Sequence, residues 1–330
     1  ELVTDIILLT MMAATAIAVA VTRDLFASVM LTGVYSLFSA SFFVLMDAVD
    51  VAFTEAAVGA GISTLLMLAT LSMTGHFEKP GGQHPLLATV VVVITGTLLV
   101  IGTMDMPLFG DVGSPVQQHV SPQYVQRAET DTGVPNVVTA VLASYRSYDT
   151  LGETVVIFVA GLGVLLLLDR PRKEQDSEDD GGIGAGWQSY RVPRVVGKLL
   201  IPPIMIFALY VQFHGDYGPG GGFQAGVIFA AAVILYALLF GAARAAEVIK
   251  LSLVRLLAAL GVLLYGSVGV VSMLAGGDFL DFSVLTEDPV HGQHMGILLI
   301  ELGVGITVAS VMILIFLTMA LRGSERRSRG

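Results

Sequence analysis

The sequence predicts an all-α, polytopic integral membrane protein with about nine transmembrane helices. Its mean hydropathy is +0.80, and 13% of its 330 residues are charged, whereas about a quarter are charged in soluble domains. Apolar runs of roughly 20 residues, the length at which a helix crosses a bilayer, recur along the whole chain. No polar stretch between these runs is long enough to build a soluble core.

Nine apolar runs are the expected membrane spans, and Glu55 opens the third of them. They cover residues 2–22, 25–46, 54–74, 85–105, 150–169, 195–213, 223–243, 252–275 and 295–320. The first run ends near Ala18-Val19-Ala20, which mimics a signal-peptide cleavage site. That run begins with acidic Glu1 and Asp5 in place of a basic region, so we expect a transmembrane helix and not a signal peptide.

The Lys and Arg residues indicate the orientation, because they are enriched in cytoplasmic loops. If residues 170–194 lie in the cytoplasm and the spans alternate, all of the 17 Lys and Arg residues are cytoplasmic except Arg127 and Arg146. This arrangement places the N-terminus outside and the C-terminus inside. The loops at 214–222 and 276–293 then face outward.

The chain divides into two halves joined by an acidic linker. Residues 170–192 contain the run EQDSEDDGG, whose charges and glycines are typical of a flexible, solvated linker. Residues 1–169, the first half, should hold five helices, and residues 193–330, the second half, should hold four. Within the first half, residues 106–148 form a long external insert, in which 137–143 could add an amphipathic or re-entrant helix.

Composition excludes several kinds of site. The chain has no Cys, so it forms no disulfide, thiolate metal site or iron–sulfur centre. Its six His residues include no HxxxH or HxH pair on an apolar helix, so we expect no cofactor and no metal beyond a transient Na⁺. The net charge of −10 argues against nucleic acid as a partner.

The most informative stretch is the broken segment, residues 214–226, in which Gly and Pro interrupt two long apolar runs. Irregular backbone at membrane depth is tolerated only where it is buried in protein or lines a wet cavity. Pro219 has a fixed φ, and Gly221 can adopt φ values closed to other residues, so we expect them to hold a tight turn. That turn would present Phe223 and Gln224 inward.

Two ionisable residues lie at the start of the broken segment. His214 could take up a proton or bind a cation, whereas Asp216 reads as a solvated loop carboxylate, as most surface charges are. We therefore expect Pro219→Gly and Phe223→Ala to impair transport more than Asp216→Asn.

Four carboxylates at the start of two spans are candidates for a proton or ion path. Asp50 and Glu55 enter the third span, and Asp149 and Glu153 enter the fifth on one helix face. A charge buried in lipid costs several kcal/mol unless it is paired or hydrated, so such residues often function. The alternative is structural. Asp50 and Asp149 could cap helices, and Glu55 and Glu153 could hold interhelical hydrogen bonds.

Glu301 is the strongest single candidate, because it lies inside the ninth span. His294 precedes it by two turns on about the same helix face. Together with the broken segment, these residues could form part of a hydrated path. Carboxylate and freed carbonyl oxygens are hard donors that suit Na⁺.

Four motifs carry a family resemblance. Residues 207–226 (FALYVQFHGDYGPGGGFQAG) and 291–296 (HGQHMG) resemble the MnhB/MrpB subunit of Mrp-type multisubunit cation/proton antiporters. Residues 50–59 (DVAFTEAAVG) and 147–153 (SYDTLGE) are similar to the carboxy-terminal region of the large MrpA subunit, which related hydrogenases carry as MbhD and MbhE. The counterpart of that region in complex I is the J-like subunit, known for a π-bulged helix and a relay role.

The resemblance implies roles for individual residues and partners for the chain. Pro219 and Phe223 match sensitive positions of the family, and a relay role is implied for Glu55 and Glu153. The familiar large subunit has, in addition, a fourteen-helix antiporter-like domain, which this sequence lacks. Antiporter-like large subunits and small membrane subunits are therefore expected as partners, together with lipids, in the inner or plasma membrane of the cell.

Three functions remain open at this point. The first is a membrane subunit of an antiporter that exports Na⁺ in exchange for H⁺, which is not an enzyme. The second is an ion-translocating subunit of a redox-driven complex, such as a hydrogenase or a complex I-like assembly, with cofactors in other chains. The third is a lipid-filled structural scaffold, in which no buried carboxylate is needed for transport.

Overall fold

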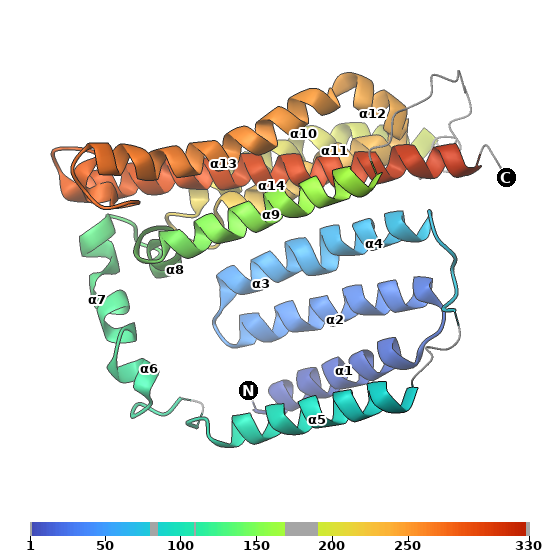
Figure 1. Cartoon of the computed structure of the whole chain (residues 1–330), viewed down its shortest axis with the longest axis horizontal. Helices are drawn as coiled ribbons and strands as arrows, with labels where there is room; N and C mark the ends of the chain where they lie inside the picture. The colour runs from blue at the N-terminus through green and yellow to red at the C-terminus, as the bar shows by residue number, and fades with distance from the viewer. Residues whose placement is uncertain (1, 80–84, 109, 169–190, 328–330) are drawn as a thin grey trace.

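The computed structural model describes residues 2–79, 85–108, 110–168 and 191–327, which form helices joined by short connections (Figure 1). Nine helices in these ranges are long and apolar enough to cross a membrane, which confirms the expected number. Within the same ranges, extended structure is confined to one isolated bridge between Asp24 and Phe77. Most of the expected linker, 170–190, lies outside the described residues.

The second half forms the compact part of the molecule. Its membrane helices are α10 (Arg191–His214), α11 (Gly222–Phe240), α13 (Leu251–Leu274) and α14 (Pro289–Arg327). The short α12 (Ala242–Val248) connects α11 to α13, and the 3₁₀ turn η4 (Phe282–Val284) precedes α14. Of the nine membrane helices, α11 and α14 are the most buried. They carry most of the apolar core, which includes Val227, Ile234, Ile297, Val308 and Leu317.

Glycines allow α14 to approach its neighbours closely. A Cβ on Gly226 of α11 would lie 2.7 Å from the main-chain oxygen of Gly305. A Cβ on Gly303 would lie 2.8 Å from the main-chain oxygen of Gly261 of α13. Small residues at helix contacts are the usual means of dense packing in membranes. The helix α14 is therefore a firm support for the polar side chains that it carries.

The first half is a looser series of helices. The chain runs through α1 (Leu2–Val21), α2 (Leu25–Leu45) and the third span to α5 (Pro85–Met104) at the edge of the molecule opposite α14, then returns to α9 (Ser147–Leu168) (Figure 1). The last of these helices, α9, packs against α13 and α14. No residue in the apolar stretch of α5 is buried within this chain.

The third span is not a continuous α-helix. Its first part, α3 (Val49–Glu55), is followed by a π-helical segment, η1 (Ala56–Ser63), and then by α4 (Thr64–Leu71). Such bulges occur often at functional sites. The resemblance to the J-like subunit of complex I implied a π-bulge, and the structure contains one directly after Glu55.

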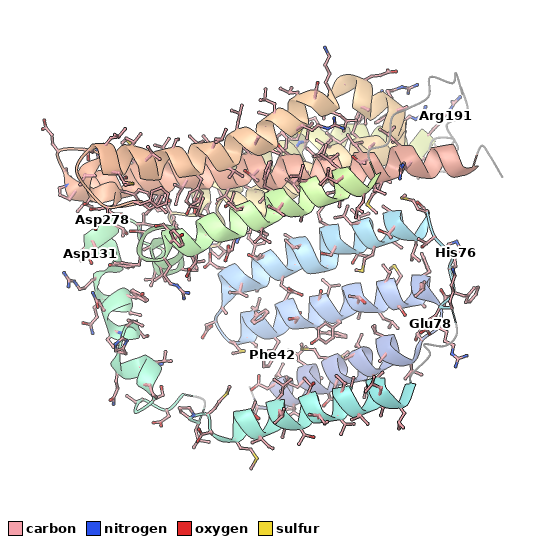
Figure 2. All side chains as sticks on the ribbon, viewed as in Figure 1. Phe42, His76, Glu78, Asp131, Arg191 and Asp278 are labelled. Carbon is pink, nitrogen blue, oxygen red and sulfur yellow. The ribbon has the colours of Figure 1, made fainter. Side chains whose placement is uncertain are left out.

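The external insert forms four short helical pieces at one end of the molecule. They are α6 (Pro115–Gln118), α7 (Ser121–Thr132), α8 (Val137–Thr139) and the π-helical η2 (Ala140–Tyr145). The last two confirm the helix expected at 137–143. Figure 2 shows Asp131 of the insert and Asp278 at this end, whereas His76 and Arg191 lie at the opposite end.

Four spans begin three or more residues earlier than hydropathy indicated. The third starts at Val49 and not at 54, the fifth at Ser147 and not at 150, the sixth at Arg191 and not at 195, and the ninth at Pro289 and not at 295. Each extension adds polar residues that have partners within the protein, such as Asp149 with Arg146. Hydropathy detects the apolar run alone, so it misses a helical turn whose polar groups are satisfied by neighbours.

Candidate functional site

The broken segment forms a compact turn between α10 and α11, as its Gly and Pro content predicts. The main-chain N–H of Gly221 donates to the carbonyl of Val211 at 3.0 Å, which ties the turn back onto α10. Gly221 has φ +109°, and a Cβ there would lie 3.0 Å from Glu301 Oε1. Both the backbone conformation and the close approach to α14 therefore require glycine.

The first turn of α11 faces inward, as predicted. Phe223 is half-buried and packs against the apolar core, and Gln224 is buried. The Gln224 side chain donates a hydrogen bond of 2.7 Å from Nε2 to Thr54 Oγ1. A polar side chain that follows the broken segment thus contacts the residue that precedes Glu55.

Asp216 is not a solvated loop carboxylate, and that expectation is wrong. It is 5% exposed, and its Oδ2 lies 2.8 Å from Nε2 of His294 on α14. The turn folds against α14, so the carboxylate points into the protein instead of outward. The other oxygen, Oδ1, is buried without a hydrogen-bond partner among the described residues.

Glu301 lies on α14 beside the same turn. Its Oε2 is buried and also has no hydrogen-bond partner in the described part of the chain. Asp216 and Asp50 are close enough to act on it electrostatically. Buried acceptors are nearly always satisfied, so each exception requires an explanation, such as a bound ion, water or proton.

Glu55 is half-buried at the junction of α3 and η1. A Cβ on Gly59 would lie 2.6 Å from both Glu55 Oε1 and Ser36 Oγ. The carboxylate therefore lies over a glycine of the π-helical segment, against α2. This location fits the buried carboxylate that the sequence predicted.

The two carboxylates of α9 have different surroundings from those expected. Asp149 forms an exposed ion pair with Arg146, with 2.6 Å between Oδ2 and Nη2. Glu153 is exposed in this chain, because the buried residues of α9 are on another face, with Thr154. Tyr265 of α13 is buried and acted on electrostatically by both Glu153 and Glu301. Tyr265 is therefore within electrostatic reach of both carboxylates.

Asn136 is a site residue that the sequence analysis missed. Its main-chain N–H donates to the carbonyl of Asp216 at 3.0 Å. Its side-chain Nδ2 lies 3.0 Å from the carbonyl of Gly218, 3.1 Å from that of Gly215 and 3.4 Å from Asp50 Oδ1. Asp50 therefore contacts Asn136 and does not cap its own helix, whose N-cap residue is Ala48.

A sequence signal for Asn136 does exist, although it is incomplete. Asn136 follows Pro135 and precedes an apolar run, a pattern typical of a helix N-cap. Its Oδ1 does accept a hydrogen bond of 3.0 Å from the main-chain N–H of Val138. No local pattern, however, indicates that the same side chain contacts a turn about 80 residues away.

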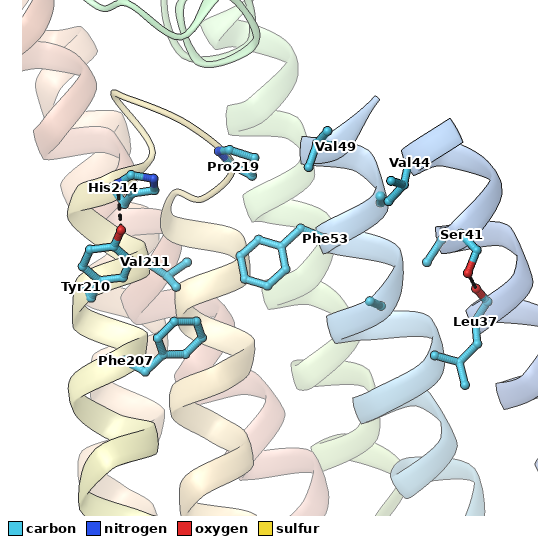
Figure 3. Close-up of a pocket in the computed structure, with 13 residues that line it drawn as sticks. Leu37, Ser41, Val44, Val49, Phe53, Phe207, Tyr210, Val211, His214 and Pro219 are labelled. Atoms are coloured by element: carbon cyan, nitrogen blue, oxygen red, sulfur yellow. Dashed lines mark hydrogen bonds between the residues drawn. The ribbon is translucent and has the colours of Figure 1, made fainter. Parts of the chain in front are cut away.

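His214 is separate from these carboxylates. Its ring stacks on Tyr210 with 4.9 Å between centroids, and its Nδ1 lies 3.3 Å from Tyr210 Oη (Figure 3). The two rings lie at the rim of an apolar cavity of about 530 Å³ between α2–α3 and α10. Pro219 also lines this cavity, and Phe53 points into it from α3 (Figure 3).

The insert is held together by its own aromatic pair. Tyr145 donates a hydrogen bond of 2.7 Å to Asp131 and stacks on Tyr124 with 5.0 Å between centroids. Burial, and then the hydrogen bond to Asp131, raise the pKa of Tyr145 to about 12. The phenol is therefore neutral at physiological pH and keeps α7 attached to η2.

The site is suited to protons and hard monovalent cations. In the described ranges, no group of three or more His, Asp or Glu side chains could hold a metal ion. The structure brings together a group of ionisable side chains near the broken segment, namely Asp50, Asp216 and Glu301 with His294. Glu55 directly follows Thr54, which is hydrogen-bonded to Gln224 of α11, while His214, Asp149 and Glu153 lie outside this group.

Three family descriptions match the chain and cover most of it. Residues 192–314 match the domain related to the MnhB subunit of the Na⁺/H⁺ antiporter. Residues 10–76 match the MbhD family and residues 89–181 match the MbhE family, both of which are described as components of MBH.

Curated proteins similar to this chain include a long antiporter subunit and a short one. The chain is 27% identical to the probable K⁺/H⁺ antiporter A/B subunit of Rhizobium meliloti over 318 residues, which are 89% of this chain and 32% of the relative. It is 33% identical over 132 residues to the putative antiporter subunit mnhB2 of Staphylococcus aureus strain Newman, covering 39% of this chain and 93% of that relative. The chain thus spans about a third of the longer relative and nearly all of the shorter one.

Two solved structures share the architecture. One is the Mrp complex from Dietzia sp. DQ12-45-1b, with a TM-score of 0.76 and 25% identity, covering 95% of this chain and 34% of that one. The other is the membrane-bound sulfane sulfur reductase, an archaeal respiratory membrane complex, with a TM-score of 0.55 and 27% identity, covering 71% of this chain and 97% of that one. The chain therefore belongs to the MnhB-related family of antiporter subunits, and in it an MnhB domain follows segments of the MbhD and MbhE families.

Proposed function

We propose that this chain is a membrane subunit of a multisubunit cation/proton antiporter that exports Na⁺ in exchange for H⁺. The observation that carries the proposal is Glu301, a carboxylate on one of the two most buried helices, with a buried oxygen that has no hydrogen-bond partner among the described residues. The printed names of the relatives, which are antiporter subunits, support the same function. On this view the chain is part of a transporter and not an enzyme.

The arrangement suits a stepwise path from the outer surface to the membrane interior. The side chain of His294 is 34% exposed and contacts Asp216, whose side chain is 7% exposed. Oδ1 of Asp216 and Oε2 of Glu301, both without a hydrogen-bond partner in the described part of the chain, would come next. A carboxylate at this depth is costly unless it holds a proton or a cation. Glu301 would alternate between these two states, supplied through His294 and Asp216.

The driving force comes from the membrane. Moving one charge across it gains about 2.3 kcal/mol per 100 mV, so an exchange of unequal charge can be driven by the potential. Partner subunits, both antiporter-like and small membrane chains, would complete the path. Glu55 and the exposed Glu153 would connect this chain to them.

The test uses the whole complex, expressed in a bacterial strain that lacks its own antiporters. Everted vesicles are acidified by respiration, and a pH-sensitive dye follows proton efflux after NaCl or KCl is added. We expect a response to NaCl with the complete complex and none when this chain alone is omitted. No response to any monovalent cation would contradict the antiporter proposal, and a response to KCl alone would correct the cation.

A second candidate is an ion-translocating subunit of a redox-driven complex. It is favoured by the likeness to a chain of the sulfane sulfur reductase. The match covers 97% of that chain. Iron and flavin analysis of the purified complex separates the two. Stoichiometric iron–sulfur or flavin subunits would support the redox-driven complex, and their absence would support the antiporter.

A further inference from the structure

Asn136 has more acceptors around its side chain than it can serve. A side-chain amide has two N–H hydrogens, but three oxygens surround this one: the carbonyls of Gly215 and Gly218 and Oδ1 of Asp50. The two carbonyls lie at 3.1 and 3.0 Å, and Asp50 lies at 3.4 Å. Asp50 and the turn therefore compete for the same two hydrogens.

The outcome of this competition depends on the charge of Asp50. An ionised carboxylate is the stronger acceptor and draws one N–H away from the turn. A neutral Asp50 leaves both hydrogens to the carbonyls of Gly215 and Gly218. The hydrogen bonds of Asn136 to the turn therefore depend on whether Asp50 carries a proton.

The turn held in this way is the one that carries Asp216. The main-chain N–H of Asn136 donates to the Asp216 carbonyl at 3.0 Å, and Thr139 Oγ1 donates to that of Gly215 at 2.7 Å. The position of the Asp216 backbone sets the distance from its carboxylate to His294. A change in the hydrogen bonds of Asn136 to the turn would therefore alter the distance between Asp216 and His294.

We propose that Asn136 is a positioning residue of the ion path, which couples the charge of Asp50 to the Asp216–His294 pair through the turn at 215–218. The role of Asn136 in transport rests on the proposed function. The hydrogen bonds by which Asn136 fixes the turn at 215–218 do not depend on that function.

Several charged or titratable groups face this region from the elements around it. They are Asp50 on α3, Asp216 in the turn, His214 at the end of α10, and His294 and Glu301 on α14. Of these described groups, Asp50 and Asp216 are the ones hydrogen-bonded to Asn136. Thr139 contacts the turn but neither carboxylate, so Thr139→Val is a matched control that removes one hydrogen bond.

The first measurement is hydrogen exchange of the purified complex, followed by mass spectrometry. Asn136→Ala should speed exchange of the amides at 215–222 about tenfold or more, because several hydrogen bonds are lost together. Thr139→Val should have a smaller effect. Unchanged exchange at 215–222 in Asn136→Ala would refute the hold on the turn, whether or not the complex transports ions.

The second measurement is the pH profile of cation-driven proton movement in everted vesicles. Asn136→Asp has nearly the same shape, so it should assemble, and its added negative charge favours proton-bound neighbours. The midpoint should therefore move to higher pH by about one unit, while Thr139→Val should lower the amplitude without moving the midpoint. In an Asp50→Asn background, the shift caused by Asn136→Asp should be smaller, because Asp50 can no longer change its charge. A native midpoint in Asn136→Asp, or an equal shift in Thr139→Val, would overturn the positioning role.

A wild-type complex with no cation response would instead refute the proposed function and leave the exchange result standing.

Discussion

Gln224 Nε2 and Thr54 Oγ1 are joined by a hydrogen bond of 2.7 Å. Gln224 belongs to the first turn of α11, at the end of the broken segment, and Thr54 directly precedes Glu55 and the π-helical η1. The bond therefore connects the irregular backbone of the second half to that of the first.

This bond can be tested with a double-mutant cycle. Gln224→Leu and Thr54→Val each remove it, and each should destabilise the complex by about 1 kcal/mol or somewhat more. The double variant should cost clearly less than the sum, because both changes remove the same interaction. Thermal unfolding of the detergent-solubilised complex, followed by size-exclusion chromatography, measures this. Simple additivity would show that the two side chains do not interact.

The burial of Asp216 changes the ranking of variants in the turn. Asp216→Asn keeps the shape but replaces the charged acceptor beside His294, and a hydrogen bond to a charged group contributes about 1.5–3 kcal/mol. Phe223→Ala removes a half-buried ring at a cost of up to about 3–5 kcal/mol. We therefore expect Asp216→Asn to impair transport as strongly as Phe223→Ala or Pro219→Gly.

His294→Gln should resemble Asp216→Asn, and the double variant should be no worse than either. Native transport by Asp216→Asn would return this residue to the role of a loop carboxylate.

Glu55 and Glu153 should both be needed for transport, although only Glu55 is partly buried within this chain. Glu55→Gln and Glu153→Gln remove the titratable group with little change in shape, so each should abolish cation-driven proton movement while the complex still assembles. Blue native electrophoresis checks assembly, and exposed Glu129→Gln on α7 is the matched control. Native exchange rates in Glu55→Gln would leave that residue a packing role only. The same result in Glu153→Gln would remove α9 from the path.

Periodicity and composition predict the helices well but not their contacts. The nine spans follow from hydropathy because each is a local property of about 20 residues. The pairing of Asp216 with His294, and of Asn136 with the turn, joins residues about 80 positions apart. Nothing local in the sequence records that the turn folds inward, so the sequence alone predicts a solvated Asp216. The boundaries of the two halves at 169 and 193 remain predictions.

Orientation also remains a prediction, and the absence of native Cys makes it easy to test. A single Cys at Ser177, which lies outside the described residues, should react with an impermeant thiol reagent only after cells are permeabilised. A single Cys at Ser283, within η4, should react in intact cells. These results would place the broken segment on the outer side. The opposite pattern would move it to the cytoplasmic side and reverse the proposed direction of the path.

Glu301 provides the most direct test of the central claim. In everted vesicles that contain the whole complex, Glu301→Gln should abolish the NaCl-driven proton signal, because the amide can neither release a proton nor neutralise a cation. Glu301→Asp should retain part of the signal with altered cation dependence, and blue native electrophoresis should show intact complexes for both variants. A native signal from an assembled Glu301→Gln complex would contradict the account and favour a structural scaffold.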